Sequence, residues 1–306
     1  MLRIRALLLV LLVFGPTAAL AAGIPYDSLI SFGDSLSDTG SGPPVPPTYG
    51  GRFSNGPVWQ EQLAGSLGLG AGQTADYAIG GAMTGTTGLG GVPTGLLTQV
   101  SGFVASPVTL GSNTLYTVWA GGNDGINLLL NPGQDPIAAI NQAALNIGSA
   151  ISQLAALGAH DFIVPKLPNG DRFPLSAANP TGQGNLFANF LNSQVDVQLA
   201  SLQASLGLTI YRLDTYTLFE SIVTSPGSYG FTNVTQACKT GSGASAVVCA
   251  NPDQYLFWDN VHPTTRGHSF IAAAALALVP EPESLALVAL ALVAVAAQLR
   301  GRSARA

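Results

Sequence analysis

Short apolar segments alternate with longer segments of helical periodicity along most of this chain, and this alternation constrains the fold more than any other feature. The expected strands are 28–32, 74–79, 114–119, 162–165 and 209–213. The clearest helices, with apolar residues three and four positions apart, are expected at 57–67, 136–157, 185–206 and 264–278. Strands separated by helices pair in parallel through right-handed crossovers. The sequence therefore predicts an α/β fold: a three-layer α/β/α sandwich around a flavodoxin-like parallel sheet of about five strands.

The octapeptide GDSLSDTG, residues 33–40, follows the first expected strand directly and contains Ser35. A serine hydroxyl becomes a good nucleophile when an imidazole takes its proton and a carboxylate orients that imidazole. Asp259 and His262 lie three residues apart on one expected loop, far downstream. We therefore predict Ser35 as the nucleophile, His262 as the base and Asp259 as the acid. The setting Gly-Asp-Ser-Leu near the N-terminus argues against the Gly-x-Ser-x-Gly elbow of ordinary α/β-hydrolases.

The chain has three histidines, and only His262 has an acid at a short, loop-compatible spacing. His160 precedes an expected strand and His268 lies near the start of the last expected helix, so structural roles are the simpler interpretation for both. Asp34 is expected to hold the nucleophile loop. No cluster of His, Cys and carboxylate stands at metal-ligand spacing in the sequence, and the serine mechanism needs neither a metal nor a cofactor.

Four ordered segments of the chain resemble the four blocks of the GDSL, or SGNH, family of serine esterases and lipases. They are the segment around Ser35 and residues 77–82, 121–124 and 259–262. The resemblance implies an oxyanion hole formed by the Ser35 backbone N–H, a glycine N–H of the second block and the Asn123 side-chain amide. The doublet Gly80-Gly81 leaves the register of that glycine open, and we favour Gly81. Each of Ser35, Gly81 and Asn123 follows an expected strand, where open parallel sheets bind ligands.

The resemblance implies carboxylic-ester hydrolysis through an acyl-enzyme, without fixing the substrate. The family includes lipases, phospholipases, short-chain esterases and sugar deacetylases, and acyl selection depends on a pocket that loops shape. A lipid ester, a short-chain ester and an acetylated extracellular polysaccharide all stay open as substrates. A further alternative is a non-catalytic envelope or matrix binding protein on the same scaffold, because a fold does not guarantee an activity.

Both ends of the chain carry targeting patterns. Residues 1–21 combine a basic start, an apolar stretch and small residues suited to cleavage, which predicts a signal peptide. Residues 279–306 resemble a PEP-CTERM sorting tail, with the motif Pro280, Glu281 and Pro282, an apolar run and a final group of arginines. This resemblance implies an exosortase-type processing enzyme and transient insertion of the tail into the inner membrane. The alternatives are a plain C-terminal membrane anchor and a buried helix. The hydrolase domain is then expected at 22–278.

The resemblance of the tail implies an exported protein of the cell envelope or extracellular matrix of a Gram-negative bacterium, and the composition and the cysteines suit export. Outside the two end segments, the chain has six Lys and Arg against fourteen Asp and Glu, a formal charge of −8. Such an acidic balance argues against nucleic acid or anionic lipid as the main partner. The only cysteines are Cys238 and Cys249, separated by a Gly/Ser-rich loop just before Asp259. In an oxidising compartment we expect them to form a disulfide that steadies the segment carrying the acid and base.

Overall fold

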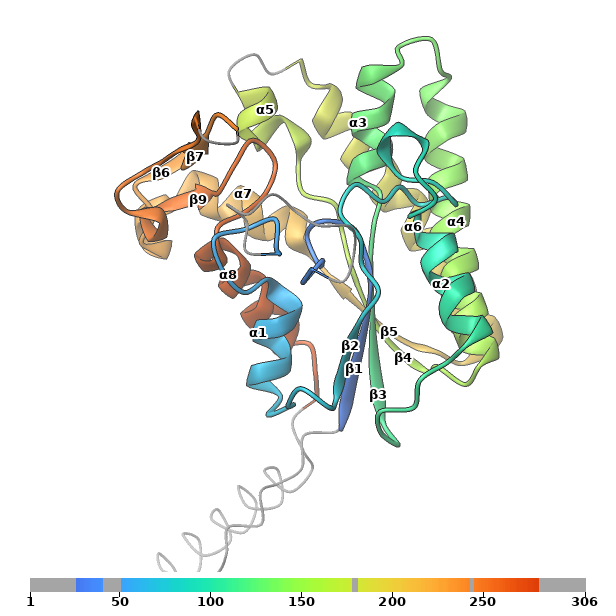
Figure 1. Cartoon of the computed structure of the whole chain (residues 1–306). Helices are drawn as coiled ribbons and strands as arrows, with labels where there is room; N and C mark the ends of the chain where they lie inside the picture. Colours follow the sequence, from blue (N-terminus) through green and yellow to red (C-terminus); the bar gives the residue numbers. More distant parts are fainter. Residues whose placement is uncertain (1–25, 41–50, 178–180, 243–244, 281–306) are drawn as a thin grey trace, which may run out of the picture. The chain divides into compact units, whose positions relative to one another are not determined.

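The structure is a computed structural model and describes residues 26–40, 51–177, 181–242 and 245–280 (Figure 1). The expected signal peptide, 1–21, lies outside the described residues. So does the expected sorting tail beyond Pro280, including Glu281 and Pro282.

The central sheet has five parallel strands in the order β2-β1-β3-β4-β5. Their bounds are β1 Ser28–Gly33, β2 Thr74–Asp76, β3 Thr114–Trp119, β4 Asp161–Pro165 and β5 Thr209–Leu213. The predicted parallel sheet is confirmed, but β2 ends three residues earlier than the expected 74–79. Beyond Asp76 the Tyr77 and Ile79 N–H groups still donate to the Ser31 and Gly33 carbonyls of β1, at 2.8 and 3.1 Å, while the Ala78 N–H donates to the Asp76 carboxylate at 2.9 Å.

The four expected helices are all present. Their bounds are α1 Trp59–Ser66, α4 Pro136–Ala156, α6 Gln183–Leu206 and α8 Thr265–Leu276. Four α-helices were not predicted: α2 Leu96–Ala105, α3 Gly122–Leu130, α5 Pro174–Ala177 and α7 Thr215–Thr224. Glycines precede α2 and α3 directly, and α5 has only four residues, so the local pattern of these segments resembles that of a loop. Short 3₁₀ helices are η2 Leu89–Gly91, η3 Gly170–Arg172, η4 Pro226–Tyr229 and η6 Pro252–Gln254.

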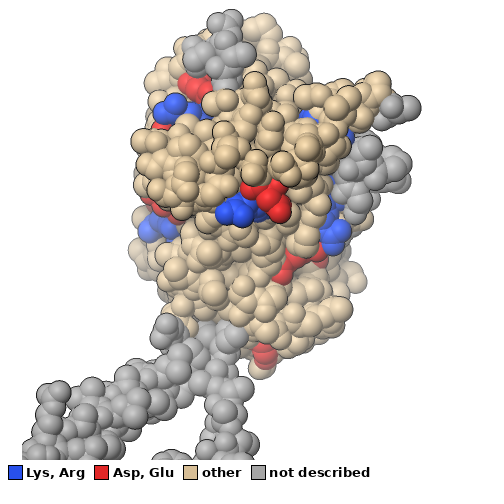
Figure 2. Space-filling view, turned by 90° about the vertical axis from the view of Figure 1, so that its left-hand side faces the viewer, with Lys and Arg blue, Asp and Glu red and all other residues tan. Residues whose placement is uncertain are grey.

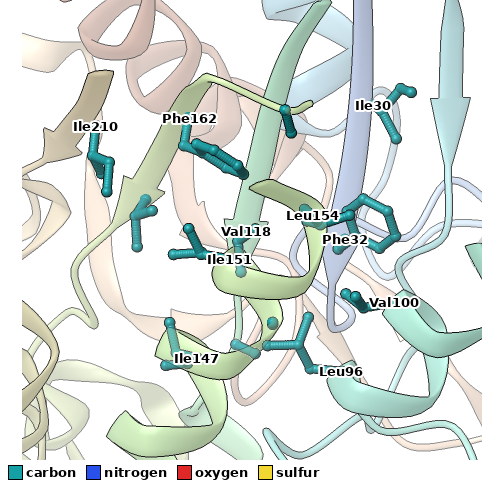
Figure 3. Close-up of a cluster of buried hydrophobic side chains, with 14 of the residues drawn as sticks. Ile30, Phe32, Leu96, Val100, Val118, Ile147, Ile151, Leu154, Phe162 and Ile210 are labelled. Atoms are coloured by element: carbon teal, nitrogen blue, oxygen red, sulfur yellow. The ribbon is translucent and has the colours of Figure 1, made fainter. Parts of the chain in front are cut away.

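Helices cover both faces of the sheet, which confirms the predicted three-layer sandwich. Helices α1, α7 and α8 lie on one face, and α2, α4 and α6 lie on the other (Figure 1). Buried side chains of the strands interdigitate with those of the second group of helices, as Figure 3 shows for Phe32, Val118 and Ile151. Phe32 also stacks on Tyr77, with ring centroids 5.2 Å apart. This apolar packing fixes β1, the strand that leads to Ser35.

A second, smaller group of strands precedes Asp259. β6 (Asn233–Ala237) pairs in parallel with β9 (Tyr255–Phe257), and β7 (Lys239–Thr240) pairs antiparallel with β8 (Val247–Val248). The expected disulfide between Cys238 and Cys249 is present and joins the β7–β8 hairpin, with Cα atoms 4.9 Å apart. The Cys238 N–H donates to the Phe257 carbonyl at 3.0 Å. The disulfide-linked hairpin is therefore bonded to the strand that leads into the acid and base.

Charged side chains are sparse on the face formed by α1, α8 and the β6–β9 pair. Figure 2 shows mostly uncharged surface there, with Lys and Arg residues lying close to Asp and Glu rather than gathered in a basic patch. Arg52 and Glu61 on this side form an ion pair at 2.6 Å. Within the ranges that the structure describes, no helix has both the length and the apolar character needed to cross a membrane.

Candidate active site

The turn after β1 presents Ser35 at the carboxyl edge of the sheet. Gly33 is required at the end of the strand because a Cβ there would lie 2.2 Å from the Trp119 carbonyl oxygen, and its φ is +153°. The Ser37 and Asp38 N–H groups both donate to the Asp34 carbonyl at 3.0 Å, which closes a single tight turn. Ser35 lies inside this turn with 8% of its surface exposed. Its hydroxyl is thus held in place by backbone geometry.

Ser35, His262 and Asp259 form a continuous hydrogen-bonded chain. His262 Nε2 lies 2.7 Å from Ser35 Oγ. His262 Nδ1 lies 2.8 Å from each carboxylate oxygen of Asp259. With its proton on Nδ1, the ring donates to Asp259 and accepts from the serine hydroxyl, as a general base requires. The structure brings together the three residues that the sequence predicted as nucleophile, base and acid.

The loop that carries Asp259 and His262 is stabilised by its own acid. Asp259 Oδ1 accepts hydrogen bonds from the Val261 N–H at 3.0 Å and from the His262 N–H at 2.9 Å. The Trp258 N–H donates to the His262 carbonyl at 2.7 Å. On the other side, the Phe53 ring packs against the His262 ring with centroids 5.1 Å apart. The imidazole is consequently held by hydrogen bonds at Nδ1 and by an aromatic contact on its ring.

Gly80 and Gly81 differ in whether the backbone N–H group is already hydrogen-bonded. This difference bears on which glycine donates to the oxyanion, a choice that the sequence left open. The Gly80 N–H donates to the Asp38 carboxylate at 2.7 Å and is therefore occupied. Among the described residues, none accepts a hydrogen bond from the Gly81 N–H or from the Ser35 N–H. Gly81 has a φ of +79°, a conformation that glycine adopts without strain. The geometry favours Gly81 over Gly80 as an available donor.

Asn123 is buried at the start of α3, with 7% of its surface exposed. Its Nδ2 donates one hydrogen bond to the Ala82 carbonyl at 2.9 Å, which leaves the second amide hydrogen for another acceptor. The next residue, Asp124, accepts from both the N–H and the hydroxyl of Thr84, at 3.0 and 2.7 Å. The Gly81 loop and the start of α3 are therefore bonded together at two adjacent points.

Several carboxyl groups lie buried around the serine turn. Burial raises the pKa of Asp34 to about 7, although the Leu36 N–H donates to its side chain at 3.0 Å and lowers that pKa in part. This hydrogen bond agrees with the expected role of Asp34 in holding the nucleophile loop. Burial also raises the pKa of Asp76 to about 7 and that of Asp124 above its ordinary value. These carboxyl groups hold the loops of the site in place by accepting hydrogen bonds from their backbone N–H groups.

The other two histidines lie in different surroundings. His160 is exposed, and its Nδ1 lies 3.2 Å from its neighbour Asp161. His268 is fully buried in α8, and burial lowers its pKa to about 3. Such a histidine is a neutral packing residue, in line with the structural role expected for it. Within the described residues, no group of three or more His, Cys, Asp or Glu side chains is placed to hold a metal ion.

Two features of the site were missed by sequence reasoning. The Gln99 side chain, on α2, accepts from the Gly33 N–H at 3.0 Å and donates to the Gly33 carbonyl at 2.8 Å, so it holds the residue before the serine turn. Phe53 covers the His262 ring. Neither residue belongs to a motif, and α2 itself was not predicted. A buried amide on an apolar helix face is the one signal that points to Gln99.

Comparison with known proteins places the whole described fold in one family. The family described as GDSL-like Lipase/Acylhydrolase matches residues 29–275. The thermolabile hemolysin of Vibrio parahaemolyticus is 27% identical over 277 residues, which cover 82% of this chain and 63% of that protein. The phosphatidylcholine-sterol acyltransferase of Aeromonas hydrophila is 25% identical over 305 residues, with 82% and 89% covered.

Among solved structures, the acetylxylan esterase Axe2 of Geobacillus stearothermophilus aligns with a TM-score of 0.49 at 14% identity, over 84% of this chain and 96% of that one. The chain spans less than two thirds of the hemolysin, so that protein's whole activity is not carried over. The family match, in contrast, extends from β1 to α8 and includes Ser35, Asn123 and His262. This protein therefore belongs to the GDSL-like lipase/acylhydrolase family, whose members hydrolyse ester bonds.

Proposed function

We propose that this protein is a serine carboxylic-ester hydrolase in which Ser35 is the nucleophile, His262 the general base and Asp259 the orienting acid. The observation that carries the proposal is the hydrogen-bonded chain from Ser35 Oγ through both ring nitrogens of His262 to Asp259, at 2.7 and 2.8 Å. Family membership supports the same reaction class independently of this geometry.

The reaction begins when His262 Nε2 takes the Ser35 hydroxyl proton and Oγ attacks the ester carbonyl carbon. The resulting tetrahedral intermediate collapses as the carbon–oxygen bond to the alcohol breaks, and the imidazolium gives its proton to the departing alcohol. Water, deprotonated in turn by His262, attacks the acyl-enzyme. The acid is released and Ser35 regains its proton. Asp259 holds the imidazole in the required tautomer and stabilises its charged form throughout.

The oxyanion is held by the Ser35 N–H, the Gly81 N–H and the Asn123 amide. Support comes from the hydrogen-bond inventory, because two of these donors have no acceptor among the described residues and the third has a hydrogen left over. Donors fixed before the reaction are worth about 2.7–4 kcal/mol each in the barrier, since they need no reorganisation as charge develops on the oxygen. The bond from Gly80 to Asp38 orients the glycine doublet so that the next N–H stays available.

We also propose that the protein is exported and processed at its C-terminus. The patterns of residues 1–21 and 279–306 support a signal peptide and a tail that inserts transiently into the inner membrane before an exosortase-type enzyme removes it. The Cys238–Cys249 disulfide supports an oxidising compartment. Mass spectrometry of the protein tests this proposal, and we expect a released form that lacks the tail 279–306. A form retained in the membrane that still carries residues 279–306 would instead indicate a permanent anchor.

The catalytic proposal is tested with Ser35→Ala and a matched control, Ser37→Ala. Ser37 is fully buried on the same turn, but its hydroxyl accepts from the Trp59 Nε1–H at 3.0 Å and does not contact His262. We expect Ser35→Ala to abolish hydrolysis of p-nitrophenyl acetate and to prevent labelling by a fluorophosphonate, while the control retains both. Peptide mapping should place the label on Ser35. A folded protein that neither hydrolyses esters nor takes the label would instead favour the non-catalytic binding protein.

A further inference from the structure

A large cavity opens directly beside Ser35. Its volume is about 970 Å³, and Ser35, Asn123 and His262 are among the residues that line it. Its walls come from α3, the start of α4, the segment from η3 to α5 and the first half of α6. Helices α3 and α5 stand beyond the carboxyl ends of the strands, at the top of Figure 1. The volume is at the upper end of the range for small-molecule sites, about 300–1,000 Å³.

Apolar side chains make up just over half of the residues that line this cavity, and uncharged polar side chains such as Gln134, Thr181 and Asn189 are among the rest. Ile140 and Leu167 are buried in the inner wall, with 4% and 7% of their surfaces exposed. Four other lining residues remain more than half exposed: Leu129 (56%), Ile137 (52%), Leu175 (52%) and Leu186 (71%). Apolar side chains that stay in water beside a binding site indicate a ligand that covers them.

Charge is scarce in the same cavity, and the carboxylates present are occupied by backbone groups. No Lys or Arg occurs among the described residues that line it. Asp34 accepts from the Leu36 N–H, and Asp171 accepts from the Gly184 N–H at the start of α6. The acidic side chains of the wall therefore do not offer a free hydrogen-bonding array to a polar ligand.

We propose that this cavity binds the acyl chain of the substrate, so that the ester is a long-chain lipid ester rather than an acetylated sugar. The inference rests on the proposed function of Ser35. An acetyl group would occupy only a small part of the cavity and would leave most of its apolar wall in contact with water. Methylene groups that leave water for this wall gain free energy, and a two-carbon acyl group has too few of them to cover it.

The position of the cavity relative to the His262 imidazole indicates where the acyl part and the alcohol part of the ester substrate would lie. The departing alcohol must face His262 Nε2 to receive its proton. Most of the cavity wall comes from α3 to α6, on the side of Asn123, and only Val261 and His262 come from the acid–base loop. An ester that places its carbonyl oxygen toward Asn123 and its alcohol toward His262 thus directs its acyl chain between α3 and α6.

The first test measures kcat/KM for p-nitrophenyl esters from acetate through butyrate and octanoate to palmitate, dispersed below their aggregation limits. We expect kcat/KM to rise by as much as about fourfold for each methylene that the cavity covers. A series that peaks at acetate, or release of acetate from an acetylated polysaccharide at a higher kcat/KM than any long-chain ester, would overturn the inference and leave the serine mechanism intact.

The second test separates binding from catalysis. Ser35→Ala removes the nucleophile, so binding of parinaric acid, a fluorescent long-chain fatty acid, reports the cavity without turnover. We expect saturable binding that palmitate displaces and acetate does not. If wild-type protein hydrolyses no ester but Ser35→Ala binds the fatty acid, the catalytic proposal fails while the acyl site stands. Absence of saturable binding by the folded variant overturns the acyl site.

The third test locates the acyl chain of the substrate with two double variants that replace leucine by uncharged glutamine. One pair lies on the cavity wall, and the other is the control. Leu129→Gln/Leu186→Gln changes two exposed leucines of the cavity wall. Leu145→Gln/Leu206→Gln changes two exposed leucines, 51% and 48% exposed, that do not line it. We expect the first pair to lower the octanoate-to-acetate ratio of kcat/KM by about tenfold, and the second pair to leave that ratio unchanged. Equal ratios in both pairs would refute the proposed path of the acyl chain.

Discussion

Replacing Gly80 by alanine should damage the site through Phe53. Gly80 does not have a positive φ, so an alanine backbone is compatible with this position. A Cβ there would lie 2.1 Å from Phe53 Cε2 and 2.4 Å from Cζ. The ring would have to move by about 1.3 Å to reach ordinary van der Waals contact at 3.4 Å. Because that ring packs on His262 at 5.1 Å between centroids, its displacement reaches the general base.

The expected size of the effect follows from the clash. Forcing an extra carbon into a packed region costs about 1–3 kcal/mol of unfolding free energy. A misplacement of about 1 Å in a catalytic arrangement lowers the rate by about a hundredfold. Urea denaturation and kcat/KM on p-nitrophenyl acetate measure the two quantities. Gly102→Ala is a control, because no atom lies within 4 Å of the Cβ that it would add.

A double-mutant cycle decides whether Phe53 is the cause. In a Phe53→Ala background the obstructing ring is absent, and Gly80→Ala should be neutral or stabilise by up to about 1 kcal/mol through its effect on the unfolded chain. The sign of the stability change should therefore reverse between the two backgrounds. An equal loss in both backgrounds, or a Gly80→Ala protein as stable and active as wild type, would refute this reasoning.

Three further predictions concern the rest of the site and its support. Asn123→Ala should lower kcat by about a hundred- to a thousandfold in steady-state assays with little change in KM, since the donor acts on charge that develops in the transition state; an unchanged kcat would remove Asn123 from the oxyanion hole. The double variant Cys238→Ser/Cys249→Ser should lose up to about 3 kcal/mol of unfolding free energy in chemical denaturation, because the bond closes a short loop; equal stability of the oxidised wild type and the variant would contradict this. Burial raises the pKa of Asp76 from 3.8 to about 7. Between these two pH values the folded protein keeps a proton that the unfolded protein releases. The free energy of unfolding should therefore fall as pH rises from about 4 to about 7. Asp76→Asn should remove that part of the slope in denaturation curves across this range, and an unaltered slope would show that Asp76 is not responsible.

The sequence by itself determined the layered α/β architecture and the chemistry of the site. Hydrophobic periodicity is a local property, so the five strands of the central sheet and helices α1, α4, α6 and α8 could be predicted from it. The spacing of Asp259 and His262 is also local, and the structure shows that their short loop does join carboxylate to imidazole. The pairing of Cys238 with Cys249 needed only an oxidising compartment and two cysteines close in the chain.

Only the tertiary structure decided which groups meet across long stretches of chain. Ser35 and His262 are 227 positions apart, and their contact depends on two loops meeting at the same edge of the sheet. The same holds for the bond from Gly80 to Asp38, which distinguishes the two glycines, and for the packing of Phe53 on His262. The cavity was beyond sequence reasoning because its walls come from four separate helical segments, and two of them, α3 and the segment from η3 to α5, were not predicted. Non-local packing sets such contacts, and no short-range pattern records it.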